Sequence, residues 1–140
     1  MFGGTWWKTM SSPRAIVACH GDLAAGLVSA VQQITGRGDA LVALSNTGLG
    51  AADVQARLHE LVQETGAHVV FTDLPAGSCT MAARRLQRDV LGLTVVVGVN
   101  LVTLLDFTFA EGTDAVAAGH AVERGRAAMQ VVAGGTPGGR

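Results

Sequence analysis

The sequence predicts one α/β domain, with helices on both faces of an open, mainly parallel sheet of strand order 2-1-3-4. Three observations predict this fold. Short apolar runs alternate with longer segments that carry apolar residues at helical spacing. Each run is apolar nearly throughout, which is typical of strands covered on both faces. The 140 residues, 49% hydrophobic and 15% charged, suffice for a single core.

The first half of the chain contains two strand–helix units. Ala15–Cys19 and Ala40–Leu44 are the predicted strands. Leu23–Ile34 and Ala51–Thr65 are the predicted helices, and a glycine after each can end it in a left-handed cap. The apolar positions expected to face the core are Leu23, Leu27, Ala30, Val31 and Ile34 in the first helix and Val54, Leu58, Leu61 and Val62 in the second.

The second half continues the alternation and ends in helices. His68–Thr72 and Thr94–Val97 are predicted strands. The predicted helices are Ser78–Leu91, Leu101–Phe109 and Asp114–Met129, the last with Val116, Ala117, Val122 and Ala127 as its apolar positions. Residues 129–133 fit two structures, an extension of the last helix or a C-terminal antiparallel strand at the sheet edge.

The domain is expected to span residues 14–133. Residues 1–13 lack periodicity and are interpreted as an N-terminal extension whose Phe2, Trp6 and Trp7 are available to dock on a surface. Residues 134–140, rich in glycine, are predicted to be a flexible tail.

Bulk composition excludes several classes of partner. A formal net charge of −1 gives no basic footprint for nucleic acid or anionic lipid. No apolar run approaches the ~20 residues that cross a bilayer, and the amino end has no signal-peptide pattern. The two cysteines, Cys19 and Cys79, do not make a disulfide framework. We therefore expect a cytoplasmic protein with reduced thiols.

The candidate site lies where predicted strands 1 and 3 end. Open parallel sheets bind ligands beyond the carboxyl ends of the strands, where the strand order reverses. In a 2-1-3-4 order, His20 and Asp73 occupy matching positions there. A carboxylate beside an imidazole accepts one ring N–H, fixes the tautomer and leaves the other nitrogen as a nucleophile.

The same edge is suited to hold an anion. Two helices are expected to begin there, near Asp22 and Ser78, and their free N–H groups attract negative charge. Gly21 and Gly77 allow close approach of the backbone, and Ser78 adds a hydroxyl. Taken singly, the aspartate reads as a turn former, the serine as a helix cap and the histidine as incidental. Their convergence favours acceptance and transfer of a phosphoryl group.

Other chemistries are less well supported by the sequence. It has no G-x-x-x-x-G-K-[ST] loop, and no G-x-G-x-x-G follows the first strand. Zinc held by Cys19, His20, Asp73 and Cys79 lacks the usual ligand spacing, so we expect neither a metal nor a cofactor. Surface or packing roles are expected for the remaining histidines, which have no evident partners: His59, His68 and His120.

Four segments together resemble the IIA component of the mannose family of the bacterial sugar phosphotransferase system. Residues 15–21 resemble its first strand and phosphorylated histidine, and residues 72–78 its D-x-x-G-G-[ST]-P segment. Residues 98–101 resemble its G-x-N-[LI] turn, and residues 123–126 a glycine-containing stretch near its C-terminus. The resemblance runs from about Arg14 to about Val132. It departs from the pattern at Ala76, where glycine is usual, and at Cys79, where proline is usual.

The resemblance implies partners and roles for particular residues. His20 corresponds to the phosphorylated histidine, Asp73 to its partner and Ser78 to the hydroxyl in the site. Family members take phosphate from the histidine-containing phosphocarrier protein and give it to a IIB component, here a separate protein. They contact the membrane only through permease components, and they are commonly homodimers that exchange a C-terminal antiparallel strand.

The sequence therefore predicts a phosphotransferase that relays phosphate on His20 for sugar uptake, with Asp73, Ser78, Gly21 and Gly77 completing the site. Two alternatives stay open. A regulatory module would use the same phosphorylated histidine to report metabolic state without moving a sugar. A metal-binding or small-molecule-binding α/β protein would hold its ligand at the same edge.

Overall fold

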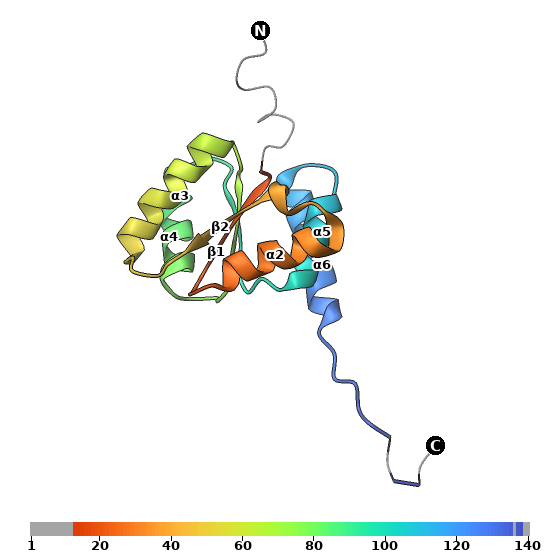
Figure 1. Ribbon diagram of the computed structural model, residues 1–140. Helices are drawn as coiled ribbons and strands as arrows, with labels where there is room; N and C mark the ends of the chain where they lie inside the picture. Colours follow the sequence, from red (N-terminus) through yellow and green to blue (C-terminus); the bar gives the residue numbers. More distant parts are fainter. Residues whose placement is uncertain (1–12, 136, 139–140) are drawn as a thin grey trace.

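The computed structural model describes residues 13–135, 137 and 138. Its strands are β1 (Ala15–Cys19), β2 (Leu41–Ser45), β3 (Val69–Thr72) and β4 (Thr94–Val96). Between them and after them lie α2 (Leu23–Thr35), the 3-10 turn η1 (Gly38–Ala40), α3 (Ala51–Thr65), α4 (Ser78–Leu86), α5 (Leu101–Phe109) and α6 (Asp114–Ala128). The four strands form one all-parallel sheet of order β2-β1-β3-β4, which confirms the predicted α/β fold (Figure 1).

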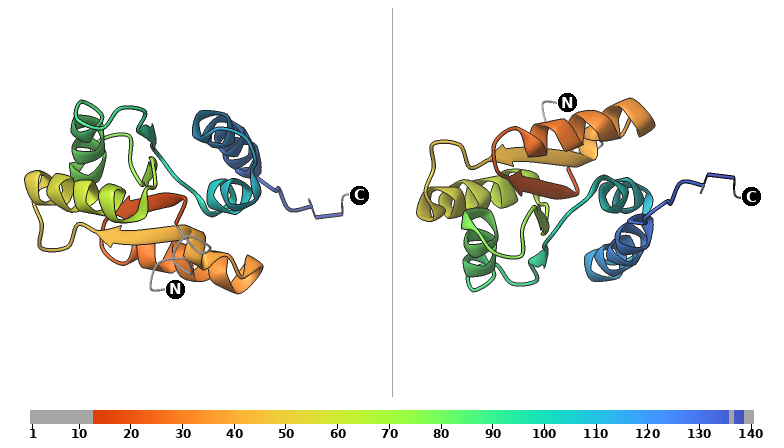
Figure 2. Two further views of the ribbon diagram at one scale, coloured as in Figure 1. Left: turned by 90° about the horizontal axis from the view of Figure 1, so that it is seen from above. Right: turned by 90° about the horizontal axis from the view of Figure 1, so that it is seen from below.

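The core has two layers because side chains of a strand alternate between the faces of the sheet. Val17 and Cys19 of β1 face α2, α5 and α6, whereas Ile16 and Ala18 face α3 and α4. Figure 2 shows the two groups of helices on opposite sides of the sheet. All five residues of β1 are fully buried, as expected for a central strand. This burial fixes the point at which the next residue, His20, leaves the sheet.

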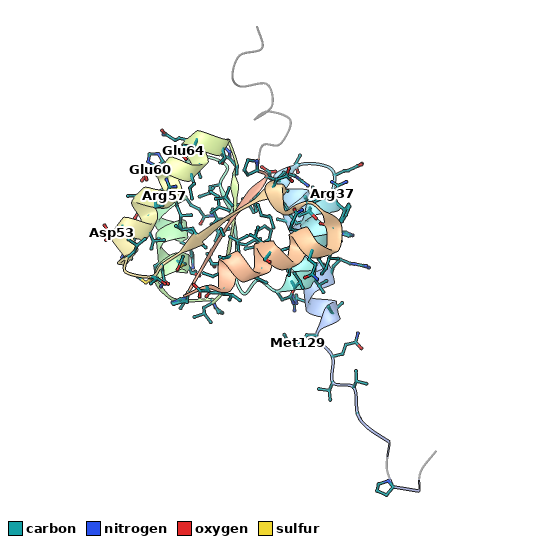
Figure 3. All side chains as sticks on the ribbon, viewed as in Figure 1. Arg37, Asp53, Arg57, Glu60, Glu64 and Met129 are labelled. Atoms are coloured by element: carbon teal, nitrogen blue, oxygen red, sulfur yellow. The ribbon has the colours of Figure 1, made fainter. Side chains whose placement is uncertain are left out.

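The outer face of α3 is polar. Arg57 lies 3.4 Å from Glu60 and 3.7 Å from Glu64, and all three side chains are exposed on the helix surface (Figure 3). Exposed pairs of this kind contribute little to stability. The opposite face buries Val54, Leu58, Leu61 and Val62, as the sequence predicts. In α2 the same reasoning was only partly right, because Leu23 and Ile34 are exposed.

Two helices differ from their predicted form. Helix α4 ends at Leu86 and not at Leu91, because tight turns follow it and the exposed Leu91 adds no burial to extend it. In α6 the buried residues are Ala117, Ala118, Ala121 and Gly125, whereas the expected Val116 and Ala127 are exposed. Small side chains at these positions let α6 pack closely on α5.

The C-terminal segment leaves the body of the domain after Ala128 (Figure 1). Residues 129–133 form neither of the expected structures within this chain, since they are neither helical nor paired with the sheet. Met129, Val131 and Val132 are exposed there. The proposed N-terminal extension lies outside the described residues except for Pro13, as do residues 136, 139 and 140 of the tail. Among the described helices, none is long and apolar enough to cross a membrane.

Candidate functional site

The structure brings His20 and Asp73 together at the carboxyl edge of the sheet. The pairing of Ala18 with Thr72 sets β1 and β3 in register, so the two strands leave the sheet side by side. The Asp73 carboxylate oxygen Oδ2 lies 2.9 Å from the His20 amide nitrogen and 2.9 Å from the ring nitrogen Nδ1. The His20 side chain is 45% exposed, whereas that of Asp73 is only 9% exposed. The pair thus offers an open imidazole on a buried carboxylate.

The protonation of this pair follows from its contacts. Burial pushes the pKa of the Asp73 carboxyl upward, but the hydrogen bonds from the His20 amide and ring outweigh burial, and the pKa falls below its ordinary value of 3.8. An ionised carboxylate can only accept, so Nδ1 of His20 carries the proton. The second ring nitrogen, Nε2, therefore has a free lone pair when the ring is neutral. The other carboxylate oxygen, Oδ1, is buried without a hydrogen-bond partner among the described residues.

Gly77 lies directly against the imidazole. A Cβ at this residue would be 3.4 Å from His20 Cε1 and 3.8 Å from Nε2, and its φ of +129° is one that L side chains rarely adopt. Gly77 precedes α4, which has no side-chain cap on its first N–H groups. The predicted helix start at Ser78 is therefore confirmed, and its amides begin next to Nε2. Gly21 follows His20 with φ +56°, and α2 begins at Leu23, again without a side-chain cap.

Hydrogen bonds from two buried threonines fix the loop from Asp73 to Gly77. The Thr72 and Thr80 hydroxyl oxygens, both in buried residues, lie 2.7 Å apart, and Thr80 donates to the Leu74 carbonyl at 2.5 Å. Ala76, which replaces the usual glycine, has no positive φ, because no described residue other than glycine does. The departure at position 76 therefore introduces no backbone strain.

The sequence did not predict that residues at the end of β2 and in the loop after it contact the candidate site. The Asn46 side-chain nitrogen Nδ2 donates to Ser78 Oγ at 3.0 Å, and the Ser45 hydroxyl donates to the Gly21 carbonyl at 2.7 Å. The signal available was their position, since residues after β2 emerge at the same edge as His20.

Both cysteines lie beneath the site as buried free thiols. Burial, reinforced by the nearby charge of Asp73, raises the pKa of Cys19 to about 12. Burial likewise raises the pKa of Cys79. Both are therefore neutral, and neutral thiols are poor nucleophiles and poor metal ligands. Within the described ranges no group of three or more His, Cys, Asp or Glu side chains is placed to hold a metal ion.

The other histidines lie away from this edge, on helix surfaces or beside a turn. His59 Nε2 is 3.2 Å from Gln63 Nε2, and His68 Nδ1 is 2.8 Å from the Gly66 carbonyl oxygen. His120 was expected to have no partner, but its Nδ1 lies 2.8 Å from Asp106 Oδ2, a contact between α5 and α6. A histidine–aspartate pair alone therefore does not mark the site; its place at the sheet edge does.

Comparison with known proteins identifies the family of this chain. The family model described as EIIA-man, the fructose IIA component of the phosphotransferase system (PTS), matches residues 14–124. The chain belongs to this IIA family. No curated protein matches the chain significantly.

Solved IIA structures share the fold of this IIA domain. The mannose/sorbose-specific IIA subunit from Enterococcus faecalis is 22% identical, with a TM-score of 0.77 over 90% of this chain and 98% of its own. The EIIA component from Streptococcus agalactiae is 19% identical, with a TM-score of 0.76 over 84% and 95%. The IIA protein associated with the fucose utilization operon of Streptococcus pneumoniae is 19% identical, with a TM-score of 0.73 over 86% and 93%.

The family motifs at residues 98–101 and 123–126 of this IIA domain contact each other and lie away from His20. Asn100 caps α5 by accepting from the Thr103 amide at 2.9 Å, and its Nδ2 donates to the Gly125 carbonyl at 2.9 Å. A Cβ at Gly125 would overlap the Thr103 hydroxyl. These residues therefore lock α5 to α6 and have a structural role.

Proposed function

We propose that this IIA component accepts a phosphoryl group on Nε2 of His20 from the histidine-containing phosphocarrier protein and passes it to a separate IIB component for sugar uptake. One observation carries the proposal: the Asp73 carboxylate holds Nδ1 of an exposed imidazole, so that Nε2 is left as the nucleophile beside the start of α4. The family to which the chain belongs is that of sugar phosphotransferase components, which supports this chemistry.

The transfer needs only the groups at this edge. The bond between phosphorus and the donor's histidine nitrogen breaks, its electron pair returns to the donor ring, and a new bond forms to Nε2 of His20. The His20 ring keeps its proton on Nδ1 and becomes cationic, which the Asp73 carboxylate stabilises. The N–H groups at the start of α4 and the Ser78 hydroxyl are the donors for the phosphoryl oxygens. The second transfer, to the IIB component, reverses these steps.

The surroundings of His20 suit a protein donor. Four large apolar side chains are exposed in the segments at this edge: Leu23, Leu49, Leu74 and Met81. Clusters of exposed apolar side chains are typical of protein–protein contacts. A macromolecular partner can bury these side chains while its phosphohistidine reaches Nε2. We expect this encounter in the cytoplasm, the compartment that the sequence favours for this chain.

The direct test is phosphorylation by the carrier. The full chain is incubated with phosphorylated phosphocarrier protein, and the modified residue is located by mass spectrometry at alkaline pH. We expect one phosphoryl group on His20 and none in His20→Ala. His120→Ala is the matched control, because it removes the other histidine that pairs with an aspartate, and it should be labelled like wild type. Undiminished labelling of His20→Ala would overturn the proposal.

Transport and signalling share this first step and differ in the second. If the phosphorylated chain gives its phosphate to a separate IIB component, the transport role stands. Phosphorylation without transfer to any IIB component encoded nearby would favour the regulatory alternative.

We also propose that the chain is a homodimer in which the C-terminal segment pairs with the partner's sheet. The outer edge of β4 has no strand beside it within the described residues. Next to β4 is a cavity of about 360 Å³, lined in part by Val97, Arg126 and Met129. Residues 129–133 belong to no helix or strand and are exposed, so they are accessible to the sheet of a partner. Light scattering should give twice the chain mass, and removal of residues 129–140 should give the monomer mass.

A further inference from the structure

The loop after β2 is fastened to the phosphate site on both sides of His20. The Asn46 amide nitrogen donates to the carbonyl of Cys19, the residue before His20, at 3.1 Å. The Ser45 hydroxyl donates at 2.7 Å to the carbonyl of Gly21, the residue after it. Asn46 is therefore held at a fixed place relative to the imidazole by bonds that do not involve its side chain.

From this fixed position, the Asn46 side chain contacts Ser78. Its Nδ2 donates to Ser78 Oγ at 3.0 Å, in a partly buried bond between this loop and the first residue of α4, 32 residues further along the sequence. A hydroxyl has one proton to donate and two lone pairs to accept with. Because Asn46 occupies a lone pair, the Ser78 proton stays available, and accepting a bond makes a hydroxyl a stronger donor. Ser78 itself follows Gly77, which lies against the His20 ring.

We propose that Asn46 is a positioning residue that orients the Ser78 hydroxyl as a donor to the phosphoryl group on His20. This inference rests on the proposed function of His20. It adds a third loop to a site that otherwise consists of the segments after β1 and β3. Asn46 acts through Ser78 and touches neither the phosphoryl group nor the partner protein.

A double-mutant cycle tests the proposal. Single-turnover transfer from phosphorylated phosphocarrier protein is measured for wild type, Asn46→Ala, Ser78→Ala and the double variant. We expect Asn46→Ala to slow transfer about tenfold, but less than about twofold when Ser78 is already alanine. The loss should fall on the maximal rate and leave the half-saturating donor concentration unchanged, because Asn46 does not contact the donor.

Two further variants separate positioning from loop damage. Asn46→Asp has nearly the same shape, but its carboxylate only accepts and would take the Ser78 proton, so transfer should be at least as slow as in Asn46→Ala. Thr47→Ala is the matched control in the same loop, because among the described residues the Thr47 hydroxyl hydrogen-bonds to Ser45 and not to Asn46 or Ser78. It should transfer at the wild-type rate. Circular dichroism and thermal unfolding establish that each variant is folded.

Independent, multiplicative losses in the cycle, or a wild-type rate in Asn46→Asp, would overturn the role of Asn46. Failure of the proposed function looks different, since wild type would then remain unlabelled or carry its phosphate on another residue.

Discussion

One carboxylate oxygen of Asp73 accepts two hydrogen bonds from His20, from the backbone amide at 2.9 Å and from ring Nδ1 at 2.9 Å. The amide bond links the loops after β1 and β3 and does not depend on which side chain occupies position 20. The ring bond fixes the tautomer and depends on the histidine. Asp73 Oδ2 therefore both links the two loops and holds the imidazole ring. Substitutions at Asp73 can separate these two roles.

Replacing Asp73 by asparagine should separate the two roles. The asparagine oxygen can still accept from the His20 amide, so the fold should persist. Its neutral side chain cannot stabilise the cationic ring of phosphohistidine, and we expect transfer to slow by about 10–100-fold. Single-turnover labelling measures the rate, and Asp106→Asn is the matched control because Asp106 pairs with His120 at 2.8 Å. Transfer at the wild-type rate in Asp73→Asn would show that the charge is dispensable.

Acid should weaken the folded state in part through Asp73. Its pKa in the folded chain lies below 3.8. In the unfolded chain the pKa is about 3.9, so the unfolded state binds the proton more readily. The stability that Asp73 contributes is thus complete above the unfolded pKa and is lost as the pH falls through the folded pKa. The difference in free energy of unfolding between wild type and Asp73→Asn should shrink from about pH 5 to about pH 3. Denaturant titrations measure it, and a difference that grows on acidification would contradict the assignment.

Gly77→Ala should damage both stability and transfer. The φ of +129° strains an alanine there, and relief of that strain would shift a Cβ that lies in van der Waals contact with the ring, 3.4 Å from His20 Cε1. We expect a loss of about 1–3 kcal/mol in the free energy of unfolding, with slower labelling. Gly92→Ala is the matched control, because its φ is +81° with nothing within 4 Å of the added Cβ. It should lose stability but keep its labelling rate; equal labelling rates in both variants would count against the close approach.

Gly125→Ala should loosen the packing of α6 on α5. The added Cβ would overlap the Thr103 hydroxyl and lie 2.9 Å from Asn100 Oδ1, which caps α5. We expect a loss of about 1–3 kcal/mol in thermal or denaturant unfolding. Gly119→Ala, in the same helix with nothing within 4 Å, should instead gain up to about 1 kcal/mol from helix propensity. Similar effects of the two substitutions would argue against the lock between these helices.

The parallel sheet was predictable from sequence, and the His20–Asp73 pair follows from it once the strand order 2-1-3-4 is assumed. Strands buried on two faces give nearly uniform apolar runs, as in β1 and β3, and their carboxyl ends must meet at one edge. No knowledge of side-chain packing was needed. The helix starts at Leu23 and Ser78 follow equally from the turn glycines before them.

Features that depend on the path of a loop or on close packing were not predictable. The bond from Asn46 to Ser78 depends on how residues 45–47 fold back over the edge, which no periodicity encodes. The buried stripe of α6 consists of alanine and glycine, which a hydrophobicity pattern ranks below the exposed Val116. Residues 129–133 form no helix or strand within this chain, and in the proposed homodimer their structure would depend on the partner's sheet.

The backbone at positions 76 and 77 bears on how the family motif should be written. Of two adjacent positions where the pattern has glycine, only Gly77 has a positive φ, and a Cβ added at Gly77 would lie 3.4 Å from the histidine ring. Position 76 tolerates a side chain because its backbone is ordinary. A search that demands both glycines would discard chains such as this one, whereas one that weights the second glycine, the histidine and the aspartate would keep them.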